Sequence, residues 1–408
     1  ANCLAEGYSG CRTDIILLLC EMINKGVTPV LPSQGSVGAC GDLAPLAHIA
    51  KVLIGDGEVW YQGEKRKSSE IFKKAGLVSV TLEPKEGLSL VNGTHFSLAI
   101  ACDVLVQAEK LLKIADITGA FSVEGDLASF HPFDEALLRA KPHLGAIKTG
   151  NNLRKMLAGS EINLTHKNCN RVQDPYSLRC MPQVHGAAKD AFSFVKNILE
   201  TELNSSTDNP LVFTDTKKII SGGNFHGESI AMAMDFLSIA LAELGSISER
   251  RVALLTDPIQ NEIPTQFLIP EPGIHSGFMI PQVVMSALVS ENKTLAHPAS
   301  VDSIPTSAGQ EDHISMSSWA ARKAKQIANN VERILGIELL AGAQAIDSVS
   351  KGKKCGKGVS TLHHYIRKSL PVLKEDKHLS SQLQIAYNFV ETGVIIDIVE
   401  KEIGSLDI

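Results

Sequence analysis

The sequence predicts a mainly α protein, in which long helices form a bundle and a loop-rich lobe precedes them. The first observation is that apolar residues recur at three- and four-residue steps over several long stretches. The second is that Ala and Leu are plentiful while aromatic residues make up only 5% of the chain, which favours helix. The third is that glycine and proline are concentrated in one early segment, residues 27–41. Because 408 residues are long for one simple core, we expect two domains, a lobe at 1–95 and a bundle at 96–408.

The N-terminal lobe is expected to combine short elements with loops. Thr13-Asp14 precedes an apolar run that Gly26 closes, which predicts a capped helix between them. Residues 27–41 carry no charged side chain and are predicted to form a buried loop. Buried loops hold backbone groups that are hard to satisfy, so such a loop tends to be functional. Residues 59–65 predict a small hairpin and residues 76–84 an extended stretch.

The helical bundle is expected to begin after Asn92-Gly93-Thr94. From there to about Phe121, apolar residues recur at helical spacing. The same spacing predicts further helices at residues 184–202, 227–255, 278–297, 314–345 and about 380–402. Two short apolar runs, 211–213 and 219–220, predict a second hairpin.

Composition excludes several functional classes. The formal charge of −6 and the pI near 6.1 show no excess of positive charge, which binding to nucleic acid or to an anionic membrane would need. The 8 cysteines include no CxxC pair, so we expect reduced thiols in a cytoplasmic protein. No apolar run approaches the roughly 20 residues that a membrane span needs. The chain opens at Ala1 inside helical sequence, and we expect that its natural N-terminus is missing.

The most informative stretch is residues 35–48, which read Gly-Ser-Val-Gly-Ala-Cys-Gly-Asp-Leu-Ala-Pro-Leu-Ala-His. Gly41 has no Cβ, so its amide nitrogen is able to approach the carbonyl carbon of Ala39 closely. Ring closure with loss of water gives an imidazolone. Loss of the leaving group from the Cβ of Cys40 then leaves an exocyclic methylene. The product is a strong electrophile that no ordinary side chain provides.

This stretch resembles the signature of the aromatic amino-acid ammonia-lyases and aminomutases, Gly-Ser-x-Gly-Ala-Ser-Gly-Asp-Leu-x-Pro-Leu. Members of that family carry the 4-methylidene-imidazol-5-one group (MIO). The sequence departs from the pattern at Cys40, where serine is usual. A thiol is able to leave by β-elimination as hydrogen sulfide. The alternative is that Cys40 is a small buried residue in an inactive relative.

Further blocks resemble the family in its own order, and such a set is more specific than any single pattern. They are residues 91–94 (Val-Asn-Gly-Thr), 173–180 (Gln-Asp-Pro-Tyr-Ser-Leu-Arg-Cys), 206–210 (Ser-Thr-Asp-Asn-Pro), 222–228 (Gly-Gly-Asn-Phe-His-Gly-Glu), 290–293 (Ser-Glu-Asn-Lys) and 305–313 (Pro-Thr-Ser-Ala-Gly-Gln-Glu-Asp-His). The resemblance therefore implies the family's mainly α fold, a long-helix bundle of the fumarase/aspartase-like type.

Five residues of these blocks are expected to serve the substrate or the electrophile. Arg179 offers a planar fork for the carboxylate of an amino acid, and the alternative is a structural salt bridge. Tyr176 would share a helix face with Arg179 and could donate or relay a proton. Asn92 could donate a hydrogen bond to the imidazolone oxygen. Phe225 is expected against the prosthetic group, or in the plain core. The resemblance adds Gln173 to this substrate-binding set.

Glu311 is the residue expected to select the substrate. A carboxylate beside an imidazole ring binds that ring or assists transfer of the β-proton. The run Gln310-Glu311-Asp312-His313 resembles the histidine-specific members, whereas phenylalanine- and tyrosine-specific members usually carry Gln at the position of Glu311. Gln310 is expected to bind substrate beside it. Taken alone, Glu311 would read as a solvated carboxylate at a helix start.

The resemblance implies deamination of L-histidine to trans-urocanate and ammonia by a homotetramer with shared active sites. The MIO would form from Ala39-Cys40-Gly41, and no external cofactor, metal ion, nucleic acid or membrane is implied. The family's N-terminal region also carries a catalytic loop tyrosine and a substrate-selecting histidine, and we expect this chain to begin after them. A phenylalanine or tyrosine ammonia-lyase, an aminomutase and an inactive relative remain as alternatives.

Overall fold

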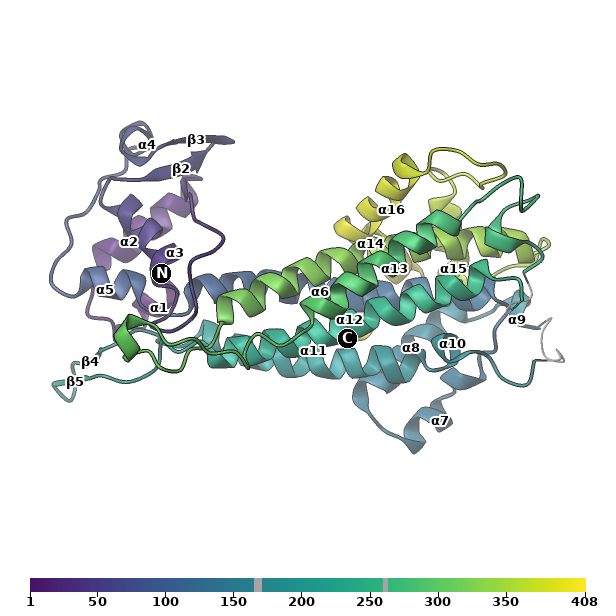
Figure 1. Cartoon of the computed structure of the whole chain (residues 1–408), viewed down its shortest axis with the longest axis horizontal. Coiled ribbons are helices and arrows are strands. Elements are labelled where there is room, and N and C mark those ends of the chain that lie inside the picture. Colours follow the sequence, from purple (N-terminus) through teal and green to yellow (C-terminus); the bar gives the residue numbers. More distant parts are fainter. Residues whose placement is uncertain (165–170, 260–262) are drawn as a thin grey trace. The chain divides into compact units, whose positions relative to one another are not determined.

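A computed structural model describes residues 1–164, 171–259 and 263–408 (Figure 1). The packing divides the chain into two compact units, each built from separate stretches of sequence. Unit 1 comprises Ala1–Val104, Phe194–Phe236 and His297–Lys325. Unit 2 comprises Leu105–Ser193, Leu237–Ala296 and Gln326–Ile408.

Helices dominate both units, as the sequence predicted. Unit 1 contains α1 (Asn2–Ala5), α2 (Thr13–Asn24), β1 (Thr28–Pro29), α3 (Leu43–Leu53), β2 (Glu58–Tyr61), β3 (Glu64–Lys67), α4 (Ser68–Ala75), α5 (Glu86–Val91), β4 (Leu211–Phe213), β5 (Lys218–Ile220) and η3 (Ser307–Gly309). Unit 2 contains η1 (His131–Phe133), α7 (Glu135–Ala140), α8 (Leu144–Leu157), α9 (Glu161–Leu164), α10 (Tyr176–Arg179), η2 (Gln266–Leu268), α13 (Met279–Leu295), α15 (Lys357–Ile366), α16 (Ser380–Thr392) and α17 (Val394–Ile403). Both units receive residues from α6 (His95–Gly125), α11 (Met181–Leu203), α12 (Glu228–Thr256) and α14 (Ser317–Val349).

The two predicted hairpins are confirmed. In the first, β2 pairs antiparallel with β3 so that Tyr61 faces Glu64, and β1 extends this sheet along the other edge of β2. In the second, β4 pairs with β5. Helices α2–α5 lie around the first sheet in Figure 1, and apolar residues of these elements, such as Ile15, Leu53 and Phe72, form the core there.

The prediction for residues 27–41 was wrong in two respects. Thr28 and Pro29 form β1 rather than loop, because β2 offers them an antiparallel edge. The segment is also not buried along its length: Val27 is buried, Leu31, Ser33, Gln34 and Gly35 are exposed, and burial resumes at Gly38 and Ala39. The low polarity of the segment reflected the packing of its two ends rather than of the whole.

The long predicted helices are confirmed, with shifts at their ends. The predicted final helix is interrupted at Gly393, whose left-handed backbone ends α16 before α17 begins. Several shorter helices were not predicted from the sequence, namely α3, α4, α5, α7, α8, α9 and α15. The predicted extended stretch at residues 76–84 lies in no helix or strand. The division into domains at residues 1–95 and 96–408 stays a prediction, since the compact units group the chain in another way.

The core of unit 2 holds buried charges that pair across helices. Glu338 of α14 accepts from the Arg251 guanidinium of α12 at 2.9 Å and from Thr118 of α6 at 2.8 Å. Asp116 of α6 lies 2.8 Å from His185 and 2.7 Å from Lys189, both on α11. Burial raises the pKa of Asp116, but Lys189 and His185 outweigh it, so this pKa lies below its ordinary value. Each buried charge thus has a partner, which fixes the register of the four helices.

Helix α12 is long and apolar enough to cross a membrane by length and composition. The share of its most apolar window that is buried inside the protein is 61%, as in a core helix, and one such helix is weak evidence for a membrane span. The seven cysteines within the described residues are free thiols, and Cys169 lies outside those residues.

Candidate active site

The segment Ala39-Cys40-Gly41 folds back on itself in unit 1. Ala39 and Gly41 form an isolated antiparallel bridge, and Gly41 also pairs with Gly93. Gly41 has a positive φ of 75°, and a Cβ there would lie 2.2 Å from the carbonyl oxygen of Gly93. A side chain at residue 41 is therefore excluded by both backbone conformation and space. The tight turn agrees with the close approach of residues 39 and 41 that ring closure requires.

Asp42 anchors this turn from inside the protein. Its backbone N–H donates to the Gly93 carbonyl oxygen at 2.8 Å. Its carboxylate accepts from the hydroxyl of Ser36 at 2.6 Å and from the hydroxyl and N–H of Ser97, both at 2.8 Å. Burial raises the pKa of Asp42, and the donors of Ser36 and Ser97 oppose that rise. The carboxylate thus ties the turn to the first turn of α6.

A second anchor comes from the chain just before α14. The N–H of Met316 donates to the Val37 carbonyl oxygen at 2.8 Å, and the hydroxyl of Ser315 donates to the Gly38 carbonyl oxygen at 2.9 Å. Segments that are far apart in sequence therefore hold the turn on both sides, which limits its freedom to the conformation described.

Glu311 lies against Cys40. The Cys40 thiol donates to the Glu311 carboxylate, which also accepts from the Thr306 hydroxyl. Burial and the Glu311 carboxylate raise the pKa of Cys40 to about 11, and the bonds from Cys40 and Thr306 lower the pKa of Glu311. At neutral pH the thiol is therefore protonated and the carboxylate ionised. Glu311 is half-buried and outside any α-helix, so the alternative of a solvated helix-start carboxylate is wrong.

Three other predicted residues belong to the same unit. Asn92 is the buried C-cap of α5; its amide nitrogen donates to the Asn209 carbonyl oxygen at 3.3 Å, while its Oδ1 has no partner among the described residues. Phe225 is half-buried in the loop before α12. Gln310 is exposed beside Glu311.

Arg179, Tyr176 and Gln173 belong to unit 2. The prediction that Tyr176 and Arg179 share a helix face is confirmed: both lie on α10, with the guanidinium carbon 4.7 Å from the ring centroid. The Nε of Arg179 is buried and has no hydrogen-bond partner within the described ranges, so the salt-bridge alternative has no support there. Gln173 is exposed and lines a cavity of about 470 Å³ within unit 2, together with Arg154.

The sequence analysis assigned no role to Asp42, His226 or His313. Asp42 was visible only as one letter of a motif, because its partner Ser97 lies far along the chain from that motif. The pattern His-Gly-Glu at residues 226–228 places two polar side chains close together in the sequence. Their neighbour His313 is distant in sequence, so the cluster of three could not be predicted.

Comparison with known proteins agrees with this geometry. The family model of the aromatic amino acid lyases matches residues 1–368. The histidine ammonia-lyase of Anaeromyxobacter dehalogenans is 49% identical over 97% of this chain and 79% of its own length, and that of Caldanaerobacter subterraneus subsp. tengcongensis is 46% identical over 98% and 78%.

Solved structures give the same fold. Histidine ammonia-lyase from Trypanosoma cruzi has a TM-score of 0.91 at 39% identity, over 98% of this chain and 76% of its own. Tyrosine aminomutase from Streptomyces globisporus has a TM-score of 0.93 at 34% identity, over 99% and 80%. With a family match over most of its length and relatives at nearly half identity, this chain belongs to the aromatic amino acid lyase family.

Proposed function

We propose that this lyase deaminates L-histidine to trans-urocanate and ammonia, and that its electrophile is an MIO made from Ala39-Cys40-Gly41. The observation that supports L-histidine as the substrate is the position of Glu311. Its carboxylate lies directly against Cys40, where an imidazole ring next to the electrophile would meet it. The relatives at 46–49% identity whose names are histidine ammonia-lyase support the same substrate.

The residues present fit the maturation chemistry. The Gly41 nitrogen attacks the Ala39 carbonyl carbon, a C–N bond forms, and the carbonyl oxygen leaves as water. The Cα of Cys40 then gives up its proton and the Cβ–S bond breaks, with the electron pair going to sulfur. The released HS⁻ takes up one proton, so hydrogen sulfide is the second product. The bridge between Ala39 and Gly41, with no space for a Cβ at residue 41, supports this ring closure.

Once formed, the MIO supplies an electrophilic methylene that turns the substrate amine into a good leaving group. Arg179 binds the substrate carboxylate through its fork, and Glu311 binds the imidazole ring. Tyr176 donates or relays the proton that moves at the substrate. Asn92 donates the second hydrogen of its amide to the imidazolone oxygen.

Phe225, Gln173 and Gln310 complete the substrate pocket. Phe225 contributes an apolar wall, while the amides of Gln173 and Gln310 contribute hydrogen bonds to the polar groups of the amino acid. We propose that the protein is a cytoplasmic homotetramer in which residues of different subunits complete each site. The exposed positions of Tyr176 and Gln173 on unit 2 support such sharing, because exposed polar side chains remain free to reach a neighbouring subunit.

The alternative within the family is an aminomutase or a lyase for phenylalanine or tyrosine. It is favoured by the structural match to tyrosine aminomutase, whose TM-score of 0.93 exceeds the 0.91 of the histidine ammonia-lyase structure. It is disfavoured by Glu311, since the ring of phenylalanine offers a carboxylate no polar group and tyrosine-specific members usually carry Gln at this position.

The decisive experiment is the mass of the tryptic peptide Gly26–Lys51 from purified protein. We expect a deficit of one water plus one hydrogen sulfide. Assays with L-histidine, L-phenylalanine and L-tyrosine side by side should then show product from L-histidine alone. An unmodified mass in folded protein would support the inactive relative, and turnover of a different amino acid would support the alternative enzymes.

A further inference from the structure

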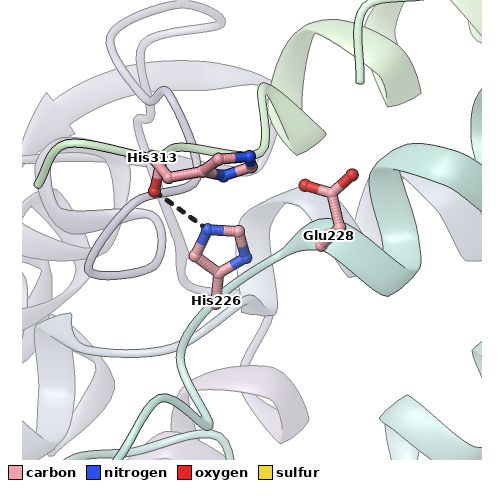
Figure 2. Close-up of side chains that lie close together, drawn as sticks. All are labelled: His226, Glu228 and His313. Atoms are coloured by element: carbon pink, nitrogen blue, oxygen red, sulfur yellow. Dashed lines mark hydrogen bonds between the residues drawn. The ribbon is translucent and has the colours of Figure 1, made fainter. Parts of the chain in front are cut away.

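We propose that His226, Glu228 and His313 form a binding site for a borderline divalent transition metal, with Zn²⁺ as the best-fitting ion (Figure 2). One ligand atom from each of the three side chains lies within 4.8 Å of the others. No metal ion was expected from the sequence. The proposed metal site does not depend on whether the protein has lyase activity.

The orientation of His226 suits a ligand. Its Nε2 lies 3.1 Å from the backbone carbonyl oxygen of His313, as the dashed line in Figure 2 shows. Because that oxygen only accepts, Nε2 carries the hydrogen and Nδ1 keeps its lone pair. A hydrogen bond from the second ring nitrogen to a backbone carbonyl is the usual way in which metal-binding imidazoles are oriented.

Glu228 carries an unsatisfied oxygen. Its Oε2 is buried and has no hydrogen-bond partner within residues 1–164, 171–259 and 263–408. A buried carboxylate oxygen without a partner is costly, and a bound cation would supply the missing interaction. Figure 2 shows the carboxylate beside both imidazole rings. His313 is exposed, so an ion has a path into the cluster from solvent.

The backbone that presents these ligands is fixed. A Cβ on Gly227, between two of the ligands, would lie 2.5 Å from the Ser317 hydroxyl, so the chain packs there without a side chain. The Gly227 N–H donates to the Gly38 carbonyl oxygen at 3.3 Å, and the Ser315 hydroxyl donates to the same oxygen at 2.9 Å. Both ligand-bearing segments are therefore anchored to the turn that precedes Ala39, and a metal would join them to each other.

The donor set selects the class of ion. Two imidazole nitrogens and one carboxylate oxygen suit zinc and its neighbours in the first transition row, whereas Mg²⁺ and Ca²⁺ prefer oxygen ligands alone. Around tetrahedral zinc, ligand atoms are separated by roughly 3.3 Å. The three ligand atoms, which lie within 4.8 Å of one another, would have to come closer by rotation of their side chains, and the fourth position is left to water.

The test is Zn²⁺ binding to EDTA-treated full chain, measured by calorimetry together with metal analysis after gel filtration. We expect about one Zn²⁺ per chain, and at least a tenfold weaker Kd in His313→Ala and in Glu228→Gln. The exposed His378 lies outside the cluster, so His378→Ala is the matched control and should bind like the wild type. Mg²⁺ should not compete.

Cysteines are the main competitors for zinc, and Co²⁺ distinguishes them. Cobalt held by imidazole and carboxylate gives weak visible bands, whereas thiolate ligands add a strong near-ultraviolet band. Absence of binding at millimolar Zn²⁺, unchanged affinity in both variants, or a thiolate band would overturn the proposal. Each readout is independent of turnover, so failure of the metal site and failure of the lyase proposal are separable.

Discussion

The guanidinium of Arg179 stacks on the ring of Tyr176, with 4.7 Å between its central carbon and the ring centroid. One helical turn brings the two together, since α10 runs from Tyr176 to Arg179. Such stacking fixes the plane of the guanidinium while its N–H groups stay available. Within the described residues the buried Nε of Arg179 has no hydrogen-bond partner, which agrees with a guanidinium that is free to bind an anion.

Replacing Arg179 by Lys should therefore weaken substrate binding without removing positive charge. Lys offers a point charge and neither stacks as a plane nor binds a carboxylate through two parallel bonds. We expect KM for L-histidine to rise at least about tenfold, in line with the loss of one charge-assisted hydrogen bond, while kcat changes less. Arg139→Lys, on an exposed i,i+4 pair with Glu135, is the control and should leave both constants unchanged. An unaltered KM in Arg179→Lys would remove Arg179 from the substrate site.

Glu311→Gln should change substrate preference. The neutral amide keeps the size of the side chain but loses the charge that favours an imidazole partner. We expect kcat/KM for L-histidine to fall about 100-fold, the equivalent of roughly 3 kcal/mol, while that for L-phenylalanine changes little. Steady-state assays of both amino acids measure this, with the exposed Glu6→Gln as control. Equal losses for both substrates would instead assign Glu311 to the reaction common to them.

Substitutions at Cys40 should separate maturation from folding. Cys40→Ser retains a leaving group, so the peptide should lose two waters and activity should persist. Cys40→Ala has no leaving group, so no methylene forms and activity should fall by at least about a thousandfold, because the electrophile itself is absent. Both variants should retain the helical circular dichroism spectrum, since Cys40 is only half-buried. Activity in Cys40→Ala would mean that the electrophile lies elsewhere.

Glu124→Gln should stabilise the protein in a pH-dependent manner. Glu124 of α6 is buried, and burial raises its pKa to about 7, although Gly356 N–H and Ser160 donate to it at 2.8 and 3.1 Å. The folded protein therefore holds this proton more tightly than the unfolded chain, and stability is lost as pH rises from about 4.5 to about 7.

The glutamine amide keeps both contacts without a charge: its oxygen accepts from the Gly356 N–H, and its nitrogen donates to the Ser160 hydroxyl oxygen. We expect Tm of Glu124→Gln to exceed that of the wild type at pH 8 and to match it near pH 4.5. Thermal unfolding at several pH values measures the difference, whose upper bound is about 3 kcal/mol. The exposed Glu375→Gln serves as control. A Tm difference independent of pH would show that folding does not shift the pKa of Glu124.

Local periodicity was sufficient to predict the long helices because α6, α12 and α14 continue for 31, 29 and 33 residues, long enough for apolar positions to recur over many turns. Short helices such as α5 and α10 have too few residues to show a period and depend on tertiary contacts. The site residues were predicted by motif, but the contact between Cys40 and Glu311 was not, since it joins segments far apart in the chain. The partial exposure of residues 27–41 escaped prediction because low polarity alone does not show that only the two ends of the segment are buried.

The contact between Gly41 and Gly93 has a consequence for how the site is inherited. A Cβ at Gly93 would lie 2.5 Å from the His95 ring and 2.7 Å from the Thr207 hydroxyl, and φ there is +130°. The space for the proposed cyclisation thus depends on two glycines, Gly41 inside the Ala-Cys-Gly triplet and Gly93 far along the chain. A relative that kept the triplet but exchanged Gly93 would still match the family signature, yet we expect that it would not form the MIO.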